Sequence, residues 1–230
     1  MQDIPTNIAR IREQIRAAAE AAGRDPHEVR LMLATKTQSP ETLREALAAG
    51  EHFFGENRVQ ELVPKVDALV DLPITWHFIG HLQTNKVRDV VGRVACIQSI
   101  DRIALADEVQ RACEKRSTSI DVMIEVNTSG EESKHGIAPS DVASLIDHVH
   151  TCSALRIVGF MTIGALSEDE AEVRACFATL RGIRDGYDAT HGTRSELSMG
   201  MSSDLAWAIA EGSTIVRVGT AAFGARNAHP

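Results

Sequence analysis

Residues 31–35 read Leu31-Met32-Leu33-Ala34-Thr35, a short unbroken apolar run that predicts a buried strand. A helical pattern precedes this run, because isoleucines recur at steps of three and four residues from Ile4 to Ile15, and Gly23-Arg24-Asp25-Pro26 ends the helix. A second helix follows the run. Ser39-Pro40 supplies its N-cap and first turn, and Gly50 is placed to end it.

The same alternation of strand and helix continues along the chain. Seven further stretches predict strands, namely residues 53–54, 76–80, 94–100, 120–126, 157–163, 197–199 and 215–219. Helical patterns separate them at residues 59–69, 85–91, 102–116, 140–149, 168–184 and 203–210. Ser167 and Glu170 have capping-box spacing before the helix predicted at 168–184. Eight strands in this length give roughly 29 residues per strand–helix unit, which suits a (β/α)₈ barrel.

The strands are mostly unbroken apolar runs, which is typical of a parallel sheet buried on both faces. We therefore predict an α/β fold, a (β/α)₈ TIM barrel in which residues 1–230 form a single domain that includes the N-terminal helix. A doubly wound open sheet is the alternative. That fold commonly carries a G-x-G-x-x-G motif after its first strand, and no such motif follows residue 35.

Composition narrows the function classes. The 230 residues include 24 Lys+Arg and 32 Asp+Glu, and the net charge of −8 argues against a general nucleic-acid binder. No apolar run approaches the roughly 18 residues of a membrane span, and no signal-peptide pattern opens the chain, so we expect a cytoplasmic protein. The four cysteines are far apart without a C-x-x-C pair, which predicts reduced thiols rather than a metal site or disulfides.

The first strand ends at a lysine. Active sites of (β/α)₈ barrels lie at the C-terminal ends of the strands, and side chains alternate along a strand. If Leu31 and Leu33 face the helices, then Met32 and Lys36 face the barrel axis. We expect the Lys36 amine to be partly desolvated there, which favours the neutral form that attacks an aldehyde. The alternative is a solvated lysine at the end of a strand.

Two other strands carry polar candidates. Asn57 follows the second strand and could hydrogen-bond to a ligand, or it could be a turn or N-cap residue. His77 shares a strand face with Ile79, so it is either a contact near the pocket or a hydrogen-bonded histidine of the core.

The last two predicted strands lead into loops that suit a phosphate group. Loops in these positions of (β/α)₈ barrels often bind phosphate through backbone N–H groups. Gly200 and Gly219 allow close backbone approach, and Ser202 and Thr220 add hydroxyls. The alternative is a pair of tight turns. Arg217 stands inside an apolar strand, so a ligand or a carboxylate is expected to face it.

An aldehyde-reactive lysine and a phosphate site at one barrel mouth together suit pyridoxal 5′-phosphate (PLP). Five motifs in order then make the chain resemble one family over nearly its whole length. They are Ala34-Thr35-Lys36-Thr37, Gly55-Glu56-Asn57 with Gln60-Glu61, Trp76 to Gln83, Leu197 to Ser202, and Val216 to Thr220 with Phe223 to Arg226. The family is the YggS/PROSC family of PLP homeostasis proteins.

The resemblance implies a barrel similar to the N-terminal domain of alanine racemase, a fold-type III PLP protein. It also implies roles around the cofactor, in which Lys36 carries PLP as an internal aldimine (a Schiff base), Ser202, Gly219 and Thr220 hold the phosphate, Asn57 and Met199 line the pocket, and Arg217 faces the pyridine nitrogen. A guanidinium there disfavours protonation of the ring and weakens PLP as an electron sink.

The sequence departs from the family pattern at two places. Arg58 stands where the family usually has tyrosine, which leaves the role of that tyrosine in doubt. Residues 129–136 keep the lysine and glycine of the family segment and differ around them.

The resemblance implies a non-catalytic PLP carrier or buffer that acts in intracellular PLP homeostasis and affects amino-acid and keto-acid balance. PLP-dependent apoenzymes are candidate recipients, and we expect a monomer or weak dimer without nucleic-acid or membrane partners. An amino-acid racemase is the alternative. Its second proton donor would be a tyrosine from a further domain, and the single tyrosine here is Tyr187. A third hypothesis is a Schiff-base aldolase that acts on a phosphorylated sugar without PLP.

Overall fold

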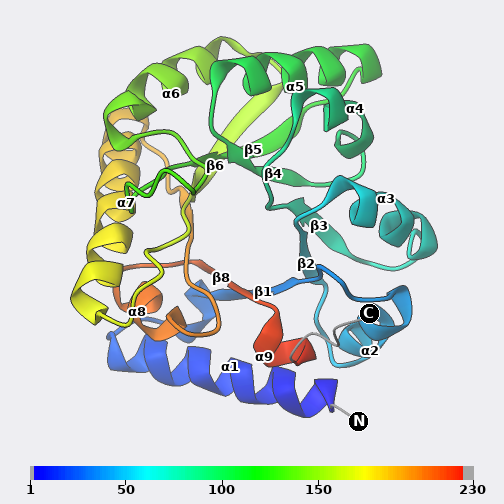
Figure 1. The fold of residues 1–230 in the computed structure, drawn as a ribbon, viewed down its shortest axis with the longest axis vertical. Helices are drawn as coiled ribbons and strands as arrows, with labels where there is room; N and C mark the ends of the chain where they lie inside the picture. Colours follow the sequence, from blue (N-terminus) through cyan, green and yellow to red (C-terminus); the bar gives the residue numbers. More distant parts are fainter. Residues whose placement is uncertain (1–2, 225–230) are drawn as a thin grey trace.

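The computed structural model describes residues 3–224, and its strands close into one barrel (Figure 1). Neighbouring strands are parallel and follow the chain order β1 to β8, with β8 paired to β1. The strands are β1 Arg30–Ala34, β2 Phe53–Glu56, β3 Thr75–Phe78, β4 Cys96–Ile100, β5 Ile120–Glu125, β6 Leu155–Met161, β7 Glu196–Ser198 and β8 Ile215–Val218. The (β/α)₈ barrel is confirmed, and the doubly wound alternative is wrong.

Helices surround the barrel (Figure 1). They are α1 Ile4–Ala21, α2 Pro40–Ala48, α3 Val59–Ala68, α4 Val87–Val90, α5 Ile103–Arg116, α6 Val142–Thr151, α7 Glu170–His191, α8 Leu205–Ala210 and α9 Thr220–Phe223, with short 3₁₀ turns at Pro26–Glu28, Thr84–Lys86 and Pro139–Asp141. The N-terminal helix α1 packs on α8, α9 and α2 beside the closing strand pair. None of the helices within residues 3–224 has both the length and the apolar character that a bilayer crossing needs.

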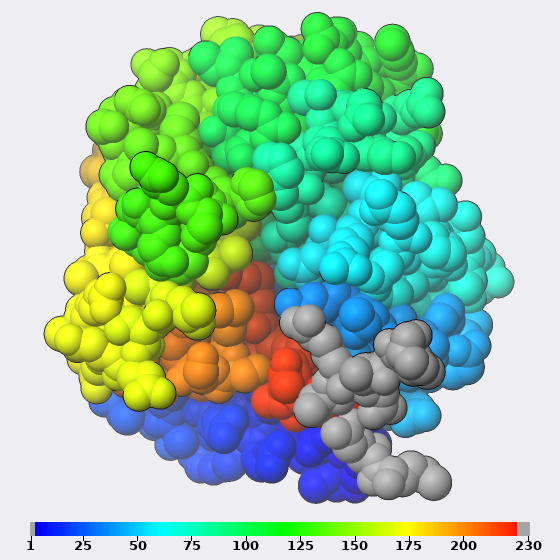
Figure 2. Space-filling model, viewed as in Figure 1, coloured from blue at the N-terminus to red at the C-terminus, as the bar shows by residue number. Residues whose placement is uncertain are grey.

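Side chains alternate between two cores. Met32, Met123 and Met161 belong to a small buried cluster inside the barrel. Leu31 and Leu33 belong to the larger core between the strands and the helices. The predicted inward direction of Met32 is therefore confirmed, and residues two positions further along the same strands point toward the barrel mouth. Figure 2 shows that this end of the barrel is hollowed between the loop after β5, in green, and the β8 region, in red.

The starts of α2 and α7 can be compared with the predicted N-caps. The Ser39 side chain accepts a hydrogen bond from the Thr42 amide at the start of α2, as its position predicts. The predicted capping box at Ser167 is wrong. α7 begins at Glu170, and its N-cap is Asp169, whose carboxylate accepts from the amide of Ala171. The Ser167 hydroxyl accepts only from the Asp169 amide, so the nearer carboxylate takes over the capping role.

Candidate functional site

Lys36 lies just beyond the end of β1. Ala34 pairs with Gly55 in the parallel register, so Lys36 is level with Asn57 on the neighbouring strand. The Lys36 side chain is exposed, and the predicted partial desolvation is therefore wrong for the chain as it stands. The loops around the mouth leave this amine in solvent, where an incoming aldehyde can reach it.

A buried lysine lies beneath this strand end. Lys65 of α3 donates to the Thr35 carbonyl at 2.7 Å and to Glu56 Oε2 at 2.6 Å. It also contacts Glu61 Oε2 at 2.9 Å, one helical turn away. The Lys65 side chain is 6% exposed and that of Glu56 is 0% exposed, so these charges depend on one another. The sequence analysis missed this cluster, although Glu61 and Lys65 have helical ion-pair spacing.

The same cluster fixes the backbone on both sides of Lys36. Lys65 holds the carbonyl of Thr35, and Glu61 Oε2 accepts from the Thr37 amide at 2.6 Å. Thr37 has a φ of +67°, a left-handed conformation that is unfavourable for a β-branched residue. The strand end is therefore bent and held at a defined position, which sets where the Lys36 side chain starts.

Asn57 offers an unused acceptor at the mouth. Its backbone N–H donates to Glu56 Oε1 at 2.7 Å. Its side-chain Oδ1 is buried without a hydrogen-bond partner among the described residues. A Cβ atom on Gly80 would lie 2.0 Å from the Asn57 carbonyl oxygen, so glycine is needed there for the two loops to meet. A buried acceptor without a donor is unfavourable, and a ligand that donates to it would remove that penalty.

Arg217 points into the barrel from β8 and is 6% exposed. Its guanidinium donates to the Ser198 hydroxyl at 2.8 Å and to the Thr162 carbonyl at 2.7 Å. Burial lowers the pKa of Arg217 to about 10, against the opposing effect of Glu125, so the group stays protonated at neutral pH. The expected carboxylate partner is not in direct contact, because neutral oxygens satisfy the two donors.

A hydrogen-bonded chain leads from Arg217 across the barrel interior. The Ser198 hydroxyl accepts from Arg217 and donates to Gln98 Oε1 at 2.7 Å. Gln98 Nε2 lies 2.8 Å from His77 Nδ1 and donates to it when the ring carries its proton on Nε2. All four side chains are buried. These hydrogen bonds thus fix the position of Arg217 from the inside of the barrel.

His77 lies inside the barrel, below the mouth. Its ring meets that of Phe53, the first residue of β2, edge-on with 4.7 Å between centroids. Burial, together with the nearby charge of Arg30, lowers the pKa of His77 to about 3. The ring is therefore neutral and acts through Gln98, which agrees with a position in the core that supports the pocket.

The loops after β7 and β8 place glycines and hydroxyls at the mouth. Gly200 has a φ of +93°, and a Cβ there would lie 2.5 Å from that of Ala208. A Cβ on Gly219 would lie 3.2 Å from the Ala34 carbonyl, so this loop touches the Lys36 strand. Ser202 and Thr220 are both exposed.

The helices that follow these loops are short. α8 has six residues and α9 has four, so the dipole of either helix would add little to the binding of an anion. Met199 is fully buried in the core that faces the helices. The last two residues of the fifth motif, Ala225 and Arg226, lie outside the described residues.

Glu125 is a site residue that the sequence analysis missed. It ends β5, two residues beyond the inward-facing Met123, and is 4% exposed. Its Oε2 has no hydrogen-bond partner among the described residues. Burial, together with the charge of Asp101, raises the pKa of Glu125 to about 7. In the closed order of eight strands β5 is opposite β1, so Glu125 lies across the mouth from Lys36.

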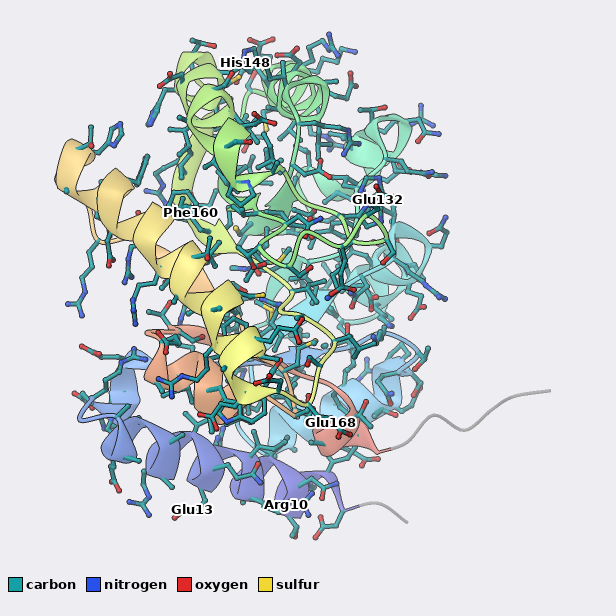
Figure 3. The ribbon with its side chains drawn as sticks, turned by 60° about the vertical axis from the view of Figure 1, so that its left-hand side comes forward. Arg10, Glu13, Glu132, His148, Phe160 and Glu168 are labelled. Atoms are coloured by element: carbon teal, nitrogen blue, oxygen red, sulfur yellow. The ribbon has the colours of Figure 1, made fainter. Side chains whose placement is uncertain are left out.

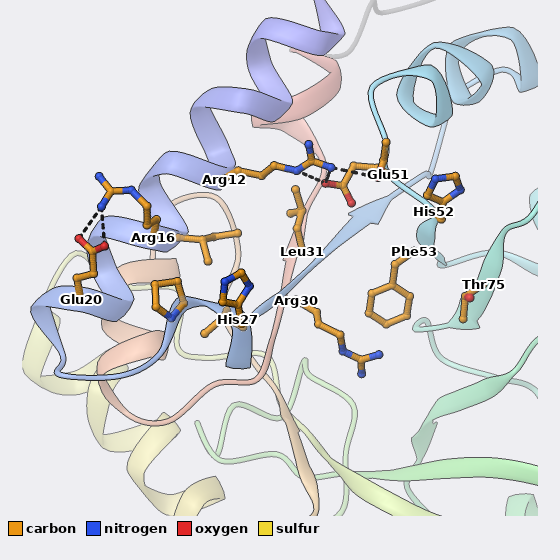
Figure 4. A pocket seen from close by; sticks show the side chains of 14 residues that line it. Arg12, Arg16, Glu20, His27, Arg30, Leu31, Glu51, His52, Phe53 and Thr75 are labelled. Atoms are coloured by element: carbon orange, nitrogen blue, oxygen red, sulfur yellow. Dashed lines mark hydrogen bonds and ion pairs between the residues drawn. The ribbon is translucent and has the colours of Figure 1, made fainter.

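Two further features lie away from this cluster. The Arg58 side chain is 70% exposed and reaches Glu61 at 3.5 Å, so it points outward from the mouth. A cavity of about 830 Å³ lies at the opposite end of the barrel, between α1 and the first residues of β1 and β2 (Figure 4). Two charged pairs lie within its own lining, Arg12 with Glu51 and Arg16 with Glu20, and Arg30 is paired with Glu196 outside it.

Comparisons with known proteins fit this arrangement. Residues 6–227 match the family model described as alanine racemase, N-terminal domain. The pyridoxal phosphate homeostasis protein of Aquifex aeolicus is 44% identical over 220 residues, which cover 95% of this chain and 96% of the relative. The chain belongs to the family of pyridoxal phosphate homeostasis proteins. The resemblance drawn from the five motifs is thereby confirmed.

Solved structures of this family and of its fold extend the comparison. PipY of Synechococcus elongatus, a structure with PLP bound, has a TM-score of 0.84 and 36% identity, and the match covers 96% of this chain and 100% of PipY. An alanine racemase of Clostridium difficile has a TM-score of 0.79 at 11% identity, and the match covers 98% of this chain but 57% of the racemase. That second likeness shows the shared barrel fold alone.

Proposed function

We propose that this protein binds PLP at the barrel mouth through Lys36 and takes part in PLP homeostasis as a carrier or buffer. Membership of the homeostasis family and the PLP-bound structure of PipY support this function. One observation of the chain itself carries it. β1 and β8 are paired strands, with Met32 opposite Arg217, so a free amine and a buried guanidinium open onto the same mouth.

The residues at this mouth fit PLP. The Lys36 amine would bond to the aldehyde carbon, and the Ser202 and Thr220 hydroxyls with the Gly219 backbone would hold the phosphate. The buried Asn57 Oδ1 lacks a donor, and a donor group on the cofactor would supply one. When bound, PLP supplies an electron-withdrawing ring and a reactive aldehyde.

Arg217 would face the pyridine nitrogen. Its contacts with Ser198 and Thr162 hold it at a fixed position, and as a cation it can donate a proton-bearing N–H but not accept a proton. A cation beside the ring nitrogen disfavours its protonation. These residues therefore suit storage of the cofactor better than carbanion chemistry, and we propose that the protein is not an enzyme.

The racemase alternative needs a second proton donor, and the single tyrosine of the sequence does not supply one. Tyr187 lies on α7, and its ring packs against Phe160 of β6, which Figure 3 labels. Glu125, by contrast, lies across the mouth from Lys36 with a pKa raised to about 7 by burial. It is a group able to exchange a proton on the far side of a bound ligand.

Cofactor binding is tested by absorbance and by reduction. The purified protein incubated with PLP is expected to turn yellow, and borohydride followed by peptide mass mapping is expected to fix PLP on Lys36. Lys36→Ala removes the label, whereas Lys115→Ala, an exposed lysine on α5, keeps it. A wild-type protein that gains no visible absorbance, or a label placed elsewhere, refutes the assignment.

Carrier and racemase differ in turnover. The PLP-loaded protein is expected to give no racemisation of common L-amino acids, and turnover that disappears in Glu125→Gln would establish the alternative. We further propose a cytoplasmic location, a single domain, a monomer or weak dimer, and PLP-dependent apoenzymes as recipients. Transfer is tested by activation of an apoenzyme mixed with the loaded protein, compared with free PLP at equal concentration.

A further inference from the structure

Three loops at the mouth bring two histidines and one aspartate together. His81 follows β3, Asp101 follows β4, and His135 lies in the loop after β5. One ligand atom from each residue lies within 4.8 Å of the other two. His81 Nδ1 is 3.5 Å from Asp101 Oδ2, and the two imidazole rings stack with 3.9 Å between centroids.

Asp101 is held so that one oxygen stays available. Its side chain is 9% exposed, and its Oδ1 is bonded by the Arg102 guanidinium. Arg102 in turn donates to the Leu82 carbonyl at 2.8 Å, next in sequence to His81. The carboxylate is therefore fixed beside the loop that carries His81, with Oδ2 turned toward the imidazole.

We propose that His81, Asp101 and His135 bind a zinc ion at the rim of the barrel mouth. Two imidazole nitrogens and one carboxylate oxygen form a common zinc ligand set, with a fourth position left for water. Zinc bonds of about 2.0–2.2 Å place tetrahedral ligand atoms roughly 3.4 Å apart. Rotation of the exposed His135 side chain supplies the small contraction needed.

The other cluster of possible ligands suits zinc less well. Asp107, His148 and Cys152 lie on α5 and at the end of α6, where His148 Nε2 is already 2.7 Å from Asp107. Burial raises the pKa of the Cys152 thiol, and zinc binds the thiolate. Figure 3 shows His148 on an outer helix, well separated from Glu132 in the loop that carries His135. His148 is therefore a matched control.

A zinc ion at the rim would join the loop after β5 to the ends of β3 and β4. That loop is also anchored by Lys134, which donates to the Gly164 carbonyl at 2.7 Å, and by Thr128, whose hydroxyl lies 2.9 Å from that of Thr162. The zinc ligands are separate from the residues assigned to PLP. The inference therefore goes beyond the proposed function and does not depend on it.

The test uses tag-free, full-length protein treated with a chelator and dialysed. Titration calorimetry with zinc chloride is expected to give one ion per chain, and cobalt(II) is expected to give the visible absorption of a tetrahedral nitrogen and oxygen site. His81→Ala and His135→Ala are each expected to weaken zinc binding at least tenfold. His148→Ala and Lys36→Ala are expected to leave it unchanged.

Each outcome decides the proposal. No zinc binding by the wild-type protein, or binding lost in His148→Ala but kept in His135→Ala, overturns it. Because His135 is exposed, its replacement leaves the core intact, and an unchanged urea midpoint without metal verifies this. A variant Lys36→Ala that loses PLP and keeps zinc shows that the two sites are distinct.

Discussion

Replacing Lys65 by methionine removes the charge beneath the Lys36 strand end while keeping a side chain of similar length. Glu56 then remains as a fully buried carboxylate whose Oε2 keeps only the Thr35 hydroxyl, at 2.8 Å. Breaking a buried ion pair on one side destabilises a protein by about 3–5 kcal/mol. For a chain of this size that corresponds to a fall in Tm of roughly 6–20 °C.

Equilibrium urea unfolding, followed by circular dichroism, measures this loss. Lys115→Met is the control, because Lys115 is exposed on α5 and its replacement is expected to change stability by less than about 0.5 kcal/mol. The double variant Lys65→Met with Glu56→Gln should recover part of the loss, since the fully buried side chain at position 56 is then neutral and Glu61 keeps Arg58 at 3.5 Å.

PLP binding provides a second measurement. Lys65 and Glu61 hold the backbone on both sides of Lys36. We therefore expect Lys65→Met to bind PLP less tightly than the wild type under native conditions. A loss below about 1 kcal/mol, or a double variant no more stable than Lys65→Met alone, would show that the reasoning about a dependent charge pair is wrong.

Three other predictions concern buried groups. Burial raises the pKa of Glu125 to about 7, so the folded protein binds extra protons between about pH 4.5 and 7 and loses stability as the pH rises through that range. In urea unfolding, Glu125→Gln should therefore be about 3 kcal/mol more stable than the wild type at pH 8 and equally stable near pH 4.5. Equal gains at both pH values would contradict this. The pKa of His77 is lowered to about 3, so the contribution of its neutral ring to stability is present above about pH 6.5 and is lost as the pH falls. Between pH 7 and pH 5 the wild type should lose about 2 kcal/mol more unfolding free energy than His77→Gln. Parallel pH profiles of the two proteins would contradict this. The four cysteines are buried free thiols, so a thiol reagent should react with none of them rapidly in buffer and with all four in urea; rapid native reaction would count against the burial.

The fold could be predicted because it depends on local patterns repeated along the chain. The run at residues 31–35 and most of its counterparts show strand character, whereas the predicted strands at 53–54 and 197–199 are short. The alternation with helices then identifies the parallel barrel. Strand limits were less predictable. β6 starts at Leu155, two residues before the predicted start, because Leu155 is already opposite Ile120 of β5 and the Ala154 carbonyl accepts from the Ile120 amide.

The site could be predicted where one residue type carries the chemistry. Lys36, Gly200 and Arg217 stand out in their own segments. The contacts that position these residues could not be predicted, because Ser198 and Gln98 are 100 residues apart in sequence and meet only across the closed barrel. Exposure of Lys36 was also missed, since it depends on how far several distant loops extend around the mouth.

Pairing between β1 and β8 has a consequence for synthesis of the protein. β1, which leads to Lys36, is the first of the eight strands to be made. β8, which carries Arg217 and leads to Thr220, is made after the other seven. At about 5–20 residues per second, roughly 10–40 s separate the two on the ribosome. During that interval the nascent chain has Lys36 but neither Arg217 nor Thr220 of the proposed phosphate loop. Cofactor capture at the proposed site therefore becomes available only after β8 has been made, and a fragment released before β8 lacks Arg217.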